Sequence, residues 1–379
     1  MRKVSLGSLV NIRTGKLDAN ASNPEGKYPF FTCSRETLKI DTYSYDCECV
    51  LVAGNGDLNV KYYNGKFDAY QRTYIIESID KNILNVKYLY YFMQLYVSKL
   101  RQMSIGGVIK YIKLNYLTDA KIPLPNIEKQ NKIVKVLEKA QELIDKRKAQ
   151  IEALDQLTQS VFLEMFGDPV LNPNKWDTNV LGSFLLNIDS GWSPKCEAYP
   201  ATNGEWGVLK LSAVTQGIYL PHENKALPKN ISPREEFEVK AGDILFTRKN
   251  TKELVGACAY VFETPKKLML PDTIFRFKFK PNQNKINEIF LWRLFNHHGI
   301  KRKLRILAEG SAGSMPNISK KKLLEFAIIV PPIELQNKFA EIVKKIQFKK
   351  EALQCSLVEL EKLSHSLMQR AFKGELFND

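Results

Sequence analysis

The sequence predicts an α+β protein in which two globular domains of mixed strands and helices are separated by two long helices, paired as an antiparallel coiled coil about a pseudo-twofold axis. Three observations predict it: a long segment occurs twice, each copy carries one narrow apolar stripe, and the regions before the copies alternate apolar and polar residues. We expect a first domain over 1–121, a central helix over 122–166, a linker with a second domain over 167–327, and a C-terminal helix with a tail over 328–379.

The repeat aligns residues 125–168 with residues 331–374 at a constant offset of 206 residues and without a gap. Twelve of the 44 positions are identical, starting with a shared proline and the pattern I-E-x-Q-N-K. A weaker similarity appears where each half begins, in the tripeptide LGS at 6–8 and 181–183. A period of about 200 residues is too long for a solenoid and suits two copies of a domain.

Both copies of the repeat predict a helix of nearly 40 residues, about 55–60 Å long, with no internal Gly or Pro. Apolar residues at alternating steps of three and four form one narrow stripe, which is typical of a coiled-coil seam. Such a helix needs a partner, and we expect the other copy to be that partner; separate packing of each helix on its own domain is the alternative. The stripe consists of Ile133, Leu137, Ala140, Ile144, Ile151, Leu154, Val161 and Met165, aligned with Phe339, Val343, Ile346, Lys350, Leu357, Leu360, Leu367 and Ala371.

Each variable region predicts several strands and one late helix, because apolar and β-branched residues alternate or run together. Asn64-Gly65 predicts a hairpin turn. The Pro-, Gly- and Asn-rich segment 167–176 predicts a loop. The expected strands are 50–54, 61–65, 72–78, 243–247, 257–263 and 273–280, and the expected helices are 88–102 and 289–305.

Composition indicates a soluble protein that binds a polyanion. The chain has 379 residues, 44% of them apolar, and no apolar run long enough to span a membrane. The N-terminal segment lacks the apolar stretch of a signal peptide, and the six Cys show no paired spacing, so we expect a cytoplasmic protein with reduced thiols. The net charge is +15, with most of the excess in the two variable regions. A basic protein without a polyanionic partner is the alternative.

Motifs of catalysis are absent from the sequence. It contains no G-x-x-x-x-G-K-[ST] loop, no H-E-x-x-H and no pair of C-x-x-C motifs, which argues against a nucleotide-driven motor and a zinc site. His297 and His298 adjoin a basic run and are expected to be solvated. We therefore expect no catalytic residue, no metal site and no cofactor in this chain.

Three features of the variable regions are of types that contact DNA. Cations at the end of the helix expected over 289–305 suit phosphate contact. Loops rich in Gly and Ser before each repeat allow close backbone approach to phosphate. An Arg-Lys-Asn loop after the strand at 243–247 offers side chains that bind guanine and adenine. The alternatives are a solvated helix end, a plain turn and a surface loop. The candidate DNA-binding residues are Lys301, Arg302, Lys303 and Arg305, then Gly106, Gly107, Lys110, Tyr111, Gly313 and Ser314, and finally Arg248, Lys249 and Asn250.

The pattern resembles the specificity subunit of type I restriction-modification systems. The resemblance rests on the helix entry P-L-P-x-x-E-Q, present as IPLPNIEKQ at 122–130 and as IIVPPIELQ at 328–336, together with AGDILFTRKN at 241–250 and FGDP at 166–169. It covers nearly the whole chain.

The resemblance implies two target-recognition domains that each recognise half of a split double-stranded DNA sequence. It implies helices that separate the domains and dock two methyltransferase subunits, with restriction motor-nuclease subunits joining later. The residues assigned to partner binding on this basis are Glu128, Gln130, Glu334 and Gln336. S-adenosylmethionine, and ATP with Mg²⁺, are expected on the partner subunits. A coiled-coil adaptor without DNA contact and a nuclease with an unrecognised site remain as alternatives.

Overall fold

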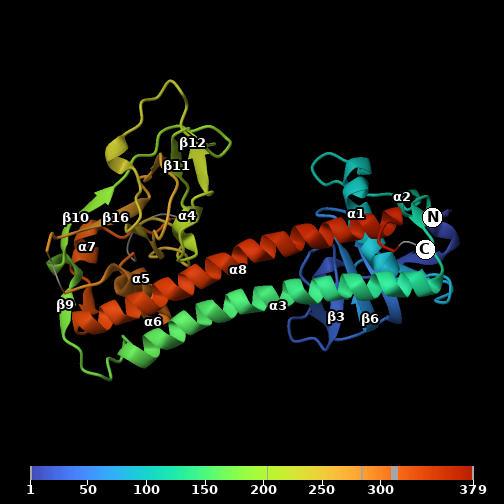
Figure 1. Ribbon diagram of the computed structural model, residues 1–379, viewed down its shortest axis with the longest axis horizontal. Helices are drawn as coiled ribbons and strands as arrows, with labels where there is room; N and C mark the ends of the chain where they lie inside the picture. Colours follow the sequence, from blue (N-terminus) through green and yellow to red (C-terminus); the bar gives the residue numbers. More distant parts are fainter. Residues whose placement is uncertain (1, 203, 283–284, 309–314, 378–379) are drawn as a thin grey trace. The chain divides into compact units, whose positions relative to one another are not determined.

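The computed structural model describes residues 2–202, 204–282, 285–308 and 315–377. The chain forms two compact units. Unit 1 comprises Met1–Gln150 and Leu353–Asp379, and unit 2 comprises Ile151–Ala352 (Figure 1). Each unit contains one β-rich globular domain and parts of both long helices.

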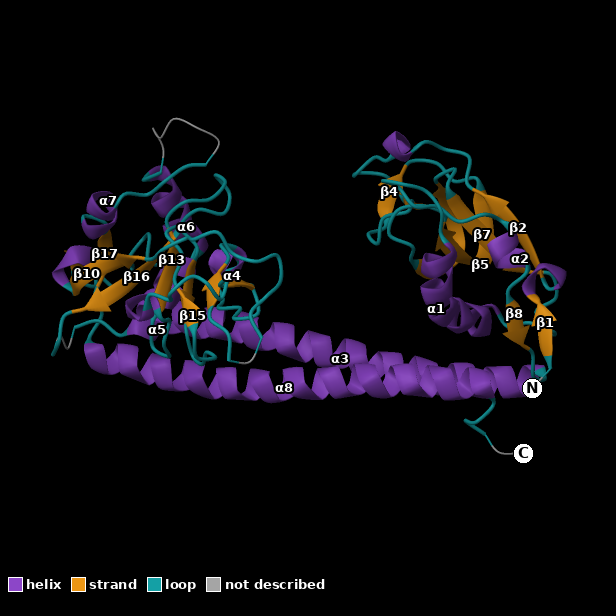
Figure 2. Ribbon diagram, turned by 90° about the horizontal axis from the view of Figure 1, so that it is seen from above, coloured by secondary structure: helices purple, strands orange, loops and turns teal. Residues whose placement is uncertain are grey.

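The two long helices, α3 (Ile127–Phe166) and α8 (Ile333–Lys373), pack together in antiparallel orientation (Figure 2). In unit 1 the first part of α3 accompanies the last part of α8, and in unit 2 the reverse holds. Lys148 pairs with Glu361 at 3.0 Å in unit 1, and Lys350 pairs with Asp155 at 2.5 Å in unit 2. The predicted pairing is confirmed, and the alternative of separately packed helices is wrong.

The predicted apolar stripe faces the interior in both units. Ile133, Leu137 and Ile144 are buried in unit 1, and Phe339 and Val343 are buried in unit 2. The stripe is not wholly apolar, because the Lys350 side chain is only 12% exposed there and meets the Asp155 carboxylate described above. The narrow stripe therefore holds the helices together along both units, while the pseudo-twofold axis stays a prediction.

Unit 1 is built around a six-stranded sheet in the order β2-β7-β5-β6-β3-β4, antiparallel except for the pair β3–β6. Helix α1 packs on strands β5 and β6 of this sheet. The strands are β1 (Lys3–Ser5), β2 (Val10–Thr14), β3 (Tyr28–Phe31), β4 (Leu38–Ile40), β5 (Tyr45–Ala53), β6 (Val60–Ala69), β7 (Thr73–Ser78) and β8 (Lys121–Pro123), and the short helices are α1 (Val86–Met103) and α2 (Asn115–Thr118).

Unit 2 has a four-stranded sheet in the order β10-β16-β13-β14 and a three-stranded sheet in the order β12-β11-β15. Its strands are β9 (Thr178–Val180), β10 (Leu185–Ser190), β11 (Gly207–Leu209), β12 (Asn224–Ala226), β13 (Ile244–Thr247), β14 (Cys258–Tyr260), β15 (Leu268–Met269), β16 (Ile274–Phe279) and β17 (Ala327–Ile329). Its short helices are α4 (Ser212–Thr215), α5 (Glu288–Asn296), α6 (His298–Ile306) and α7 (Lys320–Leu324).

Each unit opens and closes its globular domain in the same way. A first strand pairs antiparallel with the strand that leads into a long helix, β1 with β8 and β9 with β17. The tripeptide LGS follows the first strand in both units as a 3-10 turn, at Leu6–Ser8 and at Leu181–Ser183. The weak similarity between the two starts thus marks one structural element used twice.

A buried glutamine joins the start of α3 to the globular domain of unit 1. The Gln130 side chain is fully buried. Its Oε1 accepts a hydrogen bond from the Asn85 backbone N–H at 2.9 Å, and its Nε2 donates to the Ile83 and Pro125 carbonyls at 2.8 and 2.9 Å. Asn85 in turn caps α1, because its side chain accepts hydrogen bonds from the first backbone N–H groups of that helix. The helix start is therefore fixed to the domain by a fully satisfied polar group.

Unit 2 repeats this arrangement with Gln336, which is also fully buried. Its Oε1 accepts from the Asn287 N–H at 2.9 Å, and its Nε2 donates to the Lys285 and Pro331 carbonyls at 3.1 and 2.7 Å. Asn287 caps α5 as Asn85 caps α1. The shared Gln of the repeat thus has one physical role in both copies, and we call this arrangement the glutamine clamp.

The C-terminal end of each long helix packs on the short domain helix, α5 or α1, that the clamp joins to the start of the other long helix. In unit 2 the Phe166 ring contacts the Phe290 ring of α5, with centroids 4.8 Å apart. In unit 1 the Phe372 ring contacts Tyr88 of α1, also at 4.8 Å. Phe166 and Phe372 are one of the identical pairs of the repeat. Each domain therefore receives the start of one long helix and the end of the other.

Two local predictions are wrong. Asn64 and Gly65 do not form a hairpin turn; both lie inside β6 and pair with β5, opposite Glu48 and Cys47. The long buried strand β5 offers β6 a continuous ladder, which outweighs the local turn preference. The helix predicted over 289–305 is two helices, α5 and α6, because His297 has extended backbone angles (φ −64°, ψ 134°).

We predict that Gln130→Ala destabilises unit 1 by about 2–4 kcal/mol, since truncation leaves a buried N–H and two buried carbonyls without partners. Urea denaturation of the full chain measures this effect. Lys132→Ala, two residues further along the same helix and on its exposed side, is the matched control and should change stability by less than about 0.5 kcal/mol. Equal effects of the two substitutions would contradict the role of the clamp.

Candidate nucleic-acid interface

In unit 1 the candidate loop before the repeat lies against the connection between β5 and β6. The Gly56 N–H donates to the Lys110 carbonyl at 2.9 Å, and the Ile112 N–H donates to the Gly54 carbonyl at 2.9 Å. Asn55 and Tyr111 form a β-bridge between the two segments. The candidates Gly106, Gly107, Lys110 and Tyr111 thus belong to a loop that is fixed at one end of the sheet.

Unit 2 has the same junction with different residues. The Ile318 N–H donates to the Arg248 carbonyl at 2.8 Å, and Lys249 forms a β-bridge with Asn317. Ile318 is the counterpart of Ile112 at the offset of the repeat. Two predicted features, the Arg-Lys-Asn loop and the segment before the second repeat, therefore meet at one place. Gly313 and Ser314 lie outside the described residues.

The cation cluster of α6 reaches this same end of unit 2. Arg305 Nη2 donates to the carbonyl of Glu253, which belongs to the β13–β14 connection that contains Lys249. Arg302 and Lys303 are exposed, whereas Lys301 is half-buried. Burial lowers the pKa of the Lys301 ammonium, and the neighbouring Arg305 lowers it further. The cluster thus contains two solvent-facing cations, one half-buried cation in Lys301, and Arg305, which is bonded to the loop.

The side chains of the Arg-Lys-Asn loop differ in how accessible they are to an external ligand. Asn250 is buried, and its Nδ2 donates to Thr215 Oγ1 at 3.2 Å, so its amide serves the interior of the unit. The Arg248 guanidinium lies over the Phe275 ring at 5.3 Å. Lys249 is exposed. Lys249 is therefore the member of this loop whose side chain is most available to an external anion.

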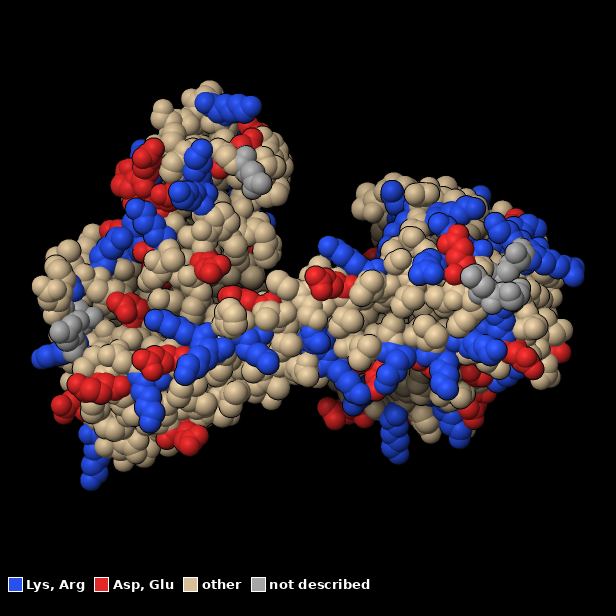
Figure 3. Space-filling model, viewed as in Figure 1, with Lys and Arg blue, Asp and Glu red and all other residues tan. Residues whose placement is uncertain are grey.

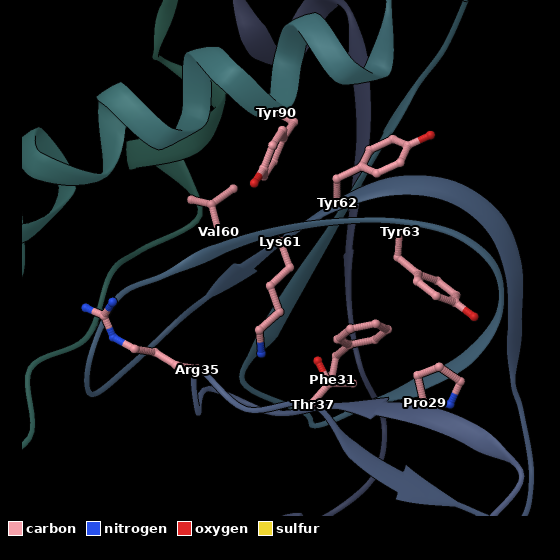
Figure 4. A pocket seen from close by; sticks show the side chains of 9 residues that line it. All are labelled: Pro29, Phe31, Arg35, Thr37, Val60, Lys61, Tyr62, Tyr63 and Tyr90. Carbon is pink, nitrogen blue, oxygen red and sulfur yellow. The ribbon is translucent and has the colours of Figure 1, made fainter. Parts of the chain in front are cut away.

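Unit 1 also has a shallow pocket that the sequence did not predict. Aromatic side chains from β3, β6 and α1 surround Lys61, whose Nζ donates to the Ser34 carbonyl at 2.6 Å (Figure 4). Burial lowers the pKa of Lys61. The lining residues are Pro29, Phe31, Arg35, Thr37, Val60, Lys61, Tyr62, Tyr63 and Tyr90. The sequence patterns assigned some of these residues to a strand or a helix but predicted no pocket, because the pocket forms only when three elements pack together.

On the face shown in Figure 3, Lys and Arg side chains are spread over both units with acidic side chains among them. The positive charge on that face therefore does not gather in a single patch. His297, expected to be solvated, is 4% exposed and packs against His298 at the break between α5 and α6. That expectation is wrong for His297, because the break turns its ring into the unit, while His298 stays exposed.

The four residues assigned to partner binding have two different environments. Glu128 and Glu334 are exposed in the first turns of α3 and α8. Gln130 and Gln336 are fully buried in the glutamine clamps, so their side chains have intramolecular roles. Only the two glutamates offer a surface to another protein.

No helix in the described part of the chain is long and apolar enough to cross a membrane. Among the same residues, no group of three or more His, Cys, Asp or Glu side chains is placed to hold a metal ion.

The chain has two β-rich domains, and each packs on the same pair of antiparallel helices. Loops at equivalent places in the two domains differ in sequence. These features define a two-domain scaffold protein. The family model "Type I restriction modification DNA specificity domain" matches residues 1–154 and 175–361. The chain therefore belongs to the family of type I restriction-modification DNA specificity subunits. Members of this family supply DNA specificity, are not themselves catalytic and carry no cofactor.

Several known proteins resemble this chain. The EcoDI specificity subunit of Escherichia coli is 25% identical over 402 residues, which covers 99% of this chain and 88% of that protein. The EcoEI specificity subunit of Escherichia coli is 36% identical over 173 residues, or 45% of this chain and 29% of that protein.

Solved structures share the fold. The S subunit from M. genitalium matches with a TM-score of 0.60 at 18% identity, covering 98% of this chain and 96% of that one. A structure from work on complex assembly and conformational transition of the type I R-M system matches with a TM-score of 0.52 at 18% identity, covering 99% of this chain and 98% of that one.

We predict that Lys301→Met stabilises unit 2 modestly, because a neutral side chain avoids the desolvation that lowers the Lys301 pKa. The same substitution should reduce the salt dependence of DNA binding by a slope of about 0.9, the loss of one phosphate contact. Thermal unfolding and binding titrations at several salt concentrations measure the two effects. A stabilised variant with an unchanged salt slope would remove Lys301 from the interface.

Proposed function

We propose that each globular domain recognises one half of a bipartite double-stranded DNA target through the loop junction at the end of its sheet. The observation that carries this proposal is that the two junctions occupy equivalent places but differ in their residues. Gly54 and Asn55 in unit 1 stand where Arg248 and Lys249 stand in unit 2. A shared frame with unlike loops suits a protein that recognises two different half-sites. We assign to this contact the candidate DNA-binding residues named above except Asn250, whose amide is hydrogen-bonded inside unit 2.

We further propose that the paired helices set the gap between the half-sites and dock two methyltransferase subunits. The seam uses one stripe of each helix, yet other large apolar side chains of α3 and α8 remain exposed. Because exposed apolar groups on long helices favour protein contact, we assign them to the docking surface with Glu128 and Glu334. The exposed apolar residues are Leu143, Leu157, Leu163, Phe348, Val358 and Leu363.

The chemistry of the complex would then lie on the partners. DNA methylation requires that a base leave the helical stack and enter a pocket of the methyltransferase. S-adenosylmethionine would bind there, and ATP with Mg²⁺ would bind to restriction subunits where these join. We place the assembly in the cytoplasm, where its DNA substrate is found.

We predict that exchanging residues 176–320 for the corresponding region of a relative changes one half-site of the methylated motif and leaves the other intact. Unit 2 contains all the exchanged residues, while the junction of unit 1 is untouched. Sequencing of methylated DNA from cells that carry each version measures the motif. A change in both halves would show that the two domains do not act as separate readers.

We predict that adding one heptad to both α3 and α8 lengthens the gap by about 3 base pairs, since seven helical residues span about 10.5 Å and B-DNA rises 3.4 Å per base pair. A heptad preserves the register of the seam. The insertion belongs between Gln150 and Ile151 in α3 and between Ala352 and Leu353 in α8, the points at which each helix passes from one unit to the other. An unchanged gap, or a change in the sequence of either half-site, would contradict the spacing role of the helices.

A further inference from the structure

The loop before the first repeat exposes two adjacent large apolar side chains. Val108 is fully exposed and Ile109 is 63% exposed. These residues lie in the loop that contains Gly106, Gly107 and Lys110, and no helix or strand covers them. Exposed apolar neighbours at a loop tip are unfavourable in water, and such a patch indicates contact with another molecule.

The loop is built to hold this pair in place. Ile105 and Tyr111 exchange two backbone hydrogen bonds, at 3.0 and 2.8 Å, which close the base of the loop. Gly106 has a φ of +118°, and a Cβ there would lie 2.5 Å from the Ile109 carbonyl oxygen. Only glycine therefore permits this turn. Beneath it, the junction with Gly54 and Gly56 fixes the loop to the sheet.

Exposed cations lie in the loop and beside its junction with the sheet. Lys110 and Lys113 are exposed on either side of Tyr111, and Arg72 is exposed beside Gly54, whose N–H donates to the Arg72 carbonyl. The nearby carboxylate of Asp57 is already paired, with Arg35 at 2.5 Å and with Arg101 at 3.5 Å. The field around the loop therefore favours an anionic partner with an apolar interior, and duplex DNA combines a charged backbone with an apolar base stack.

We propose that Val108 and Ile109 form an apolar wedge that enters the DNA at one base step of the half-site recognised by unit 1 and partly unstacks it. This proposal rests on the proposed DNA recognition by unit 1. Apolar side chains, Ile among them, are the kind that proteins insert between base steps. Both residues are β-branched, so their side chains are stiff and lose little freedom on insertion. Lys110 and Lys113 would hold the adjacent phosphates.

The second half of the chain lacks this pair. At the offset of the repeat, Val108 and Ile109 correspond to Ser314 and Met315. The wedge is thus a property of the first domain, and its loss should affect one half-site only.

The test uses the full chain in complex with its methyltransferase subunits, on duplexes that carry the methylated motif found by sequencing. The fluorescent base 2-aminopurine replaces bases of the unit 1 half-site one at a time, leaving the methylated base itself unchanged. We expect the wild-type complex to raise the fluorescence at one step, because the base there is unstacked. We expect V108S/I109S to abolish that rise and to bind about 10- to 100-fold more weakly.

Ile79→Ser is the matched control, because Ile79 is 58% exposed in unit 1 outside the junction. It should keep both the fluorescence and the affinity. A rise that persists in V108S/I109S overturns the wedge. A second result also overturns the wedge: no base is unstacked, and replacing thymine with uracil in the DNA weakens binding as much as V108S/I109S does. The loop would then contact a thymine methyl group and would not enter the base stack. If the wild-type complex shows no preference for the motif, the proposed function fails instead.

Discussion

The rest of the structure depends on the glutamine clamp. A buried amide is costly unless every polar atom finds a partner, and in both clamps it does. Gln130 and Gln336 each accept one backbone N–H from a helix-capping asparagine and donate to two carbonyls. Each clamp therefore fixes the first turn of a long helix to the capped helix of a globular domain. Since the same helix receives an aromatic side chain from the end of the other long helix, each domain is held by both.

This frame tolerates variation at the sheet ends. The junctions are made by backbone hydrogen bonds, Ile112 to Gly54 in unit 1 and Ile318 to Arg248 in unit 2, and backbone groups are the same whatever side chain they carry. The loops can thus differ in sequence without loss of the junction. A DNA specificity subunit needs this separation, because its frame can then stay constant while its DNA contacts change with the target.

Locally unfavourable features collect at the same ends. Lys301 is half-buried with a lowered pKa, the Arg248 Nε is buried without a hydrogen-bond partner among the described residues, and Val108 is fully exposed. None of these stabilises the fold of its own unit. Proteins keep such features where a ligand compensates for them. Their coincidence in the two junctions supports the assignment of the DNA contacts to these loops.

The sequence by itself determined the frame: the 206-residue repeat, the paired antiparallel helices and the equivalence of the two LGS turns. Helical period and shared register are local signals that survive packing. Tertiary structure alone decided the rest. In the folded units, Asn64 and Gly65 lie in a strand, and the His297, Gln130 and Gln336 side chains are buried. Candidate segments that are separate in the sequence lie next to each other. These outcomes depend on contacts between residues far apart in the chain, which no local pattern encodes.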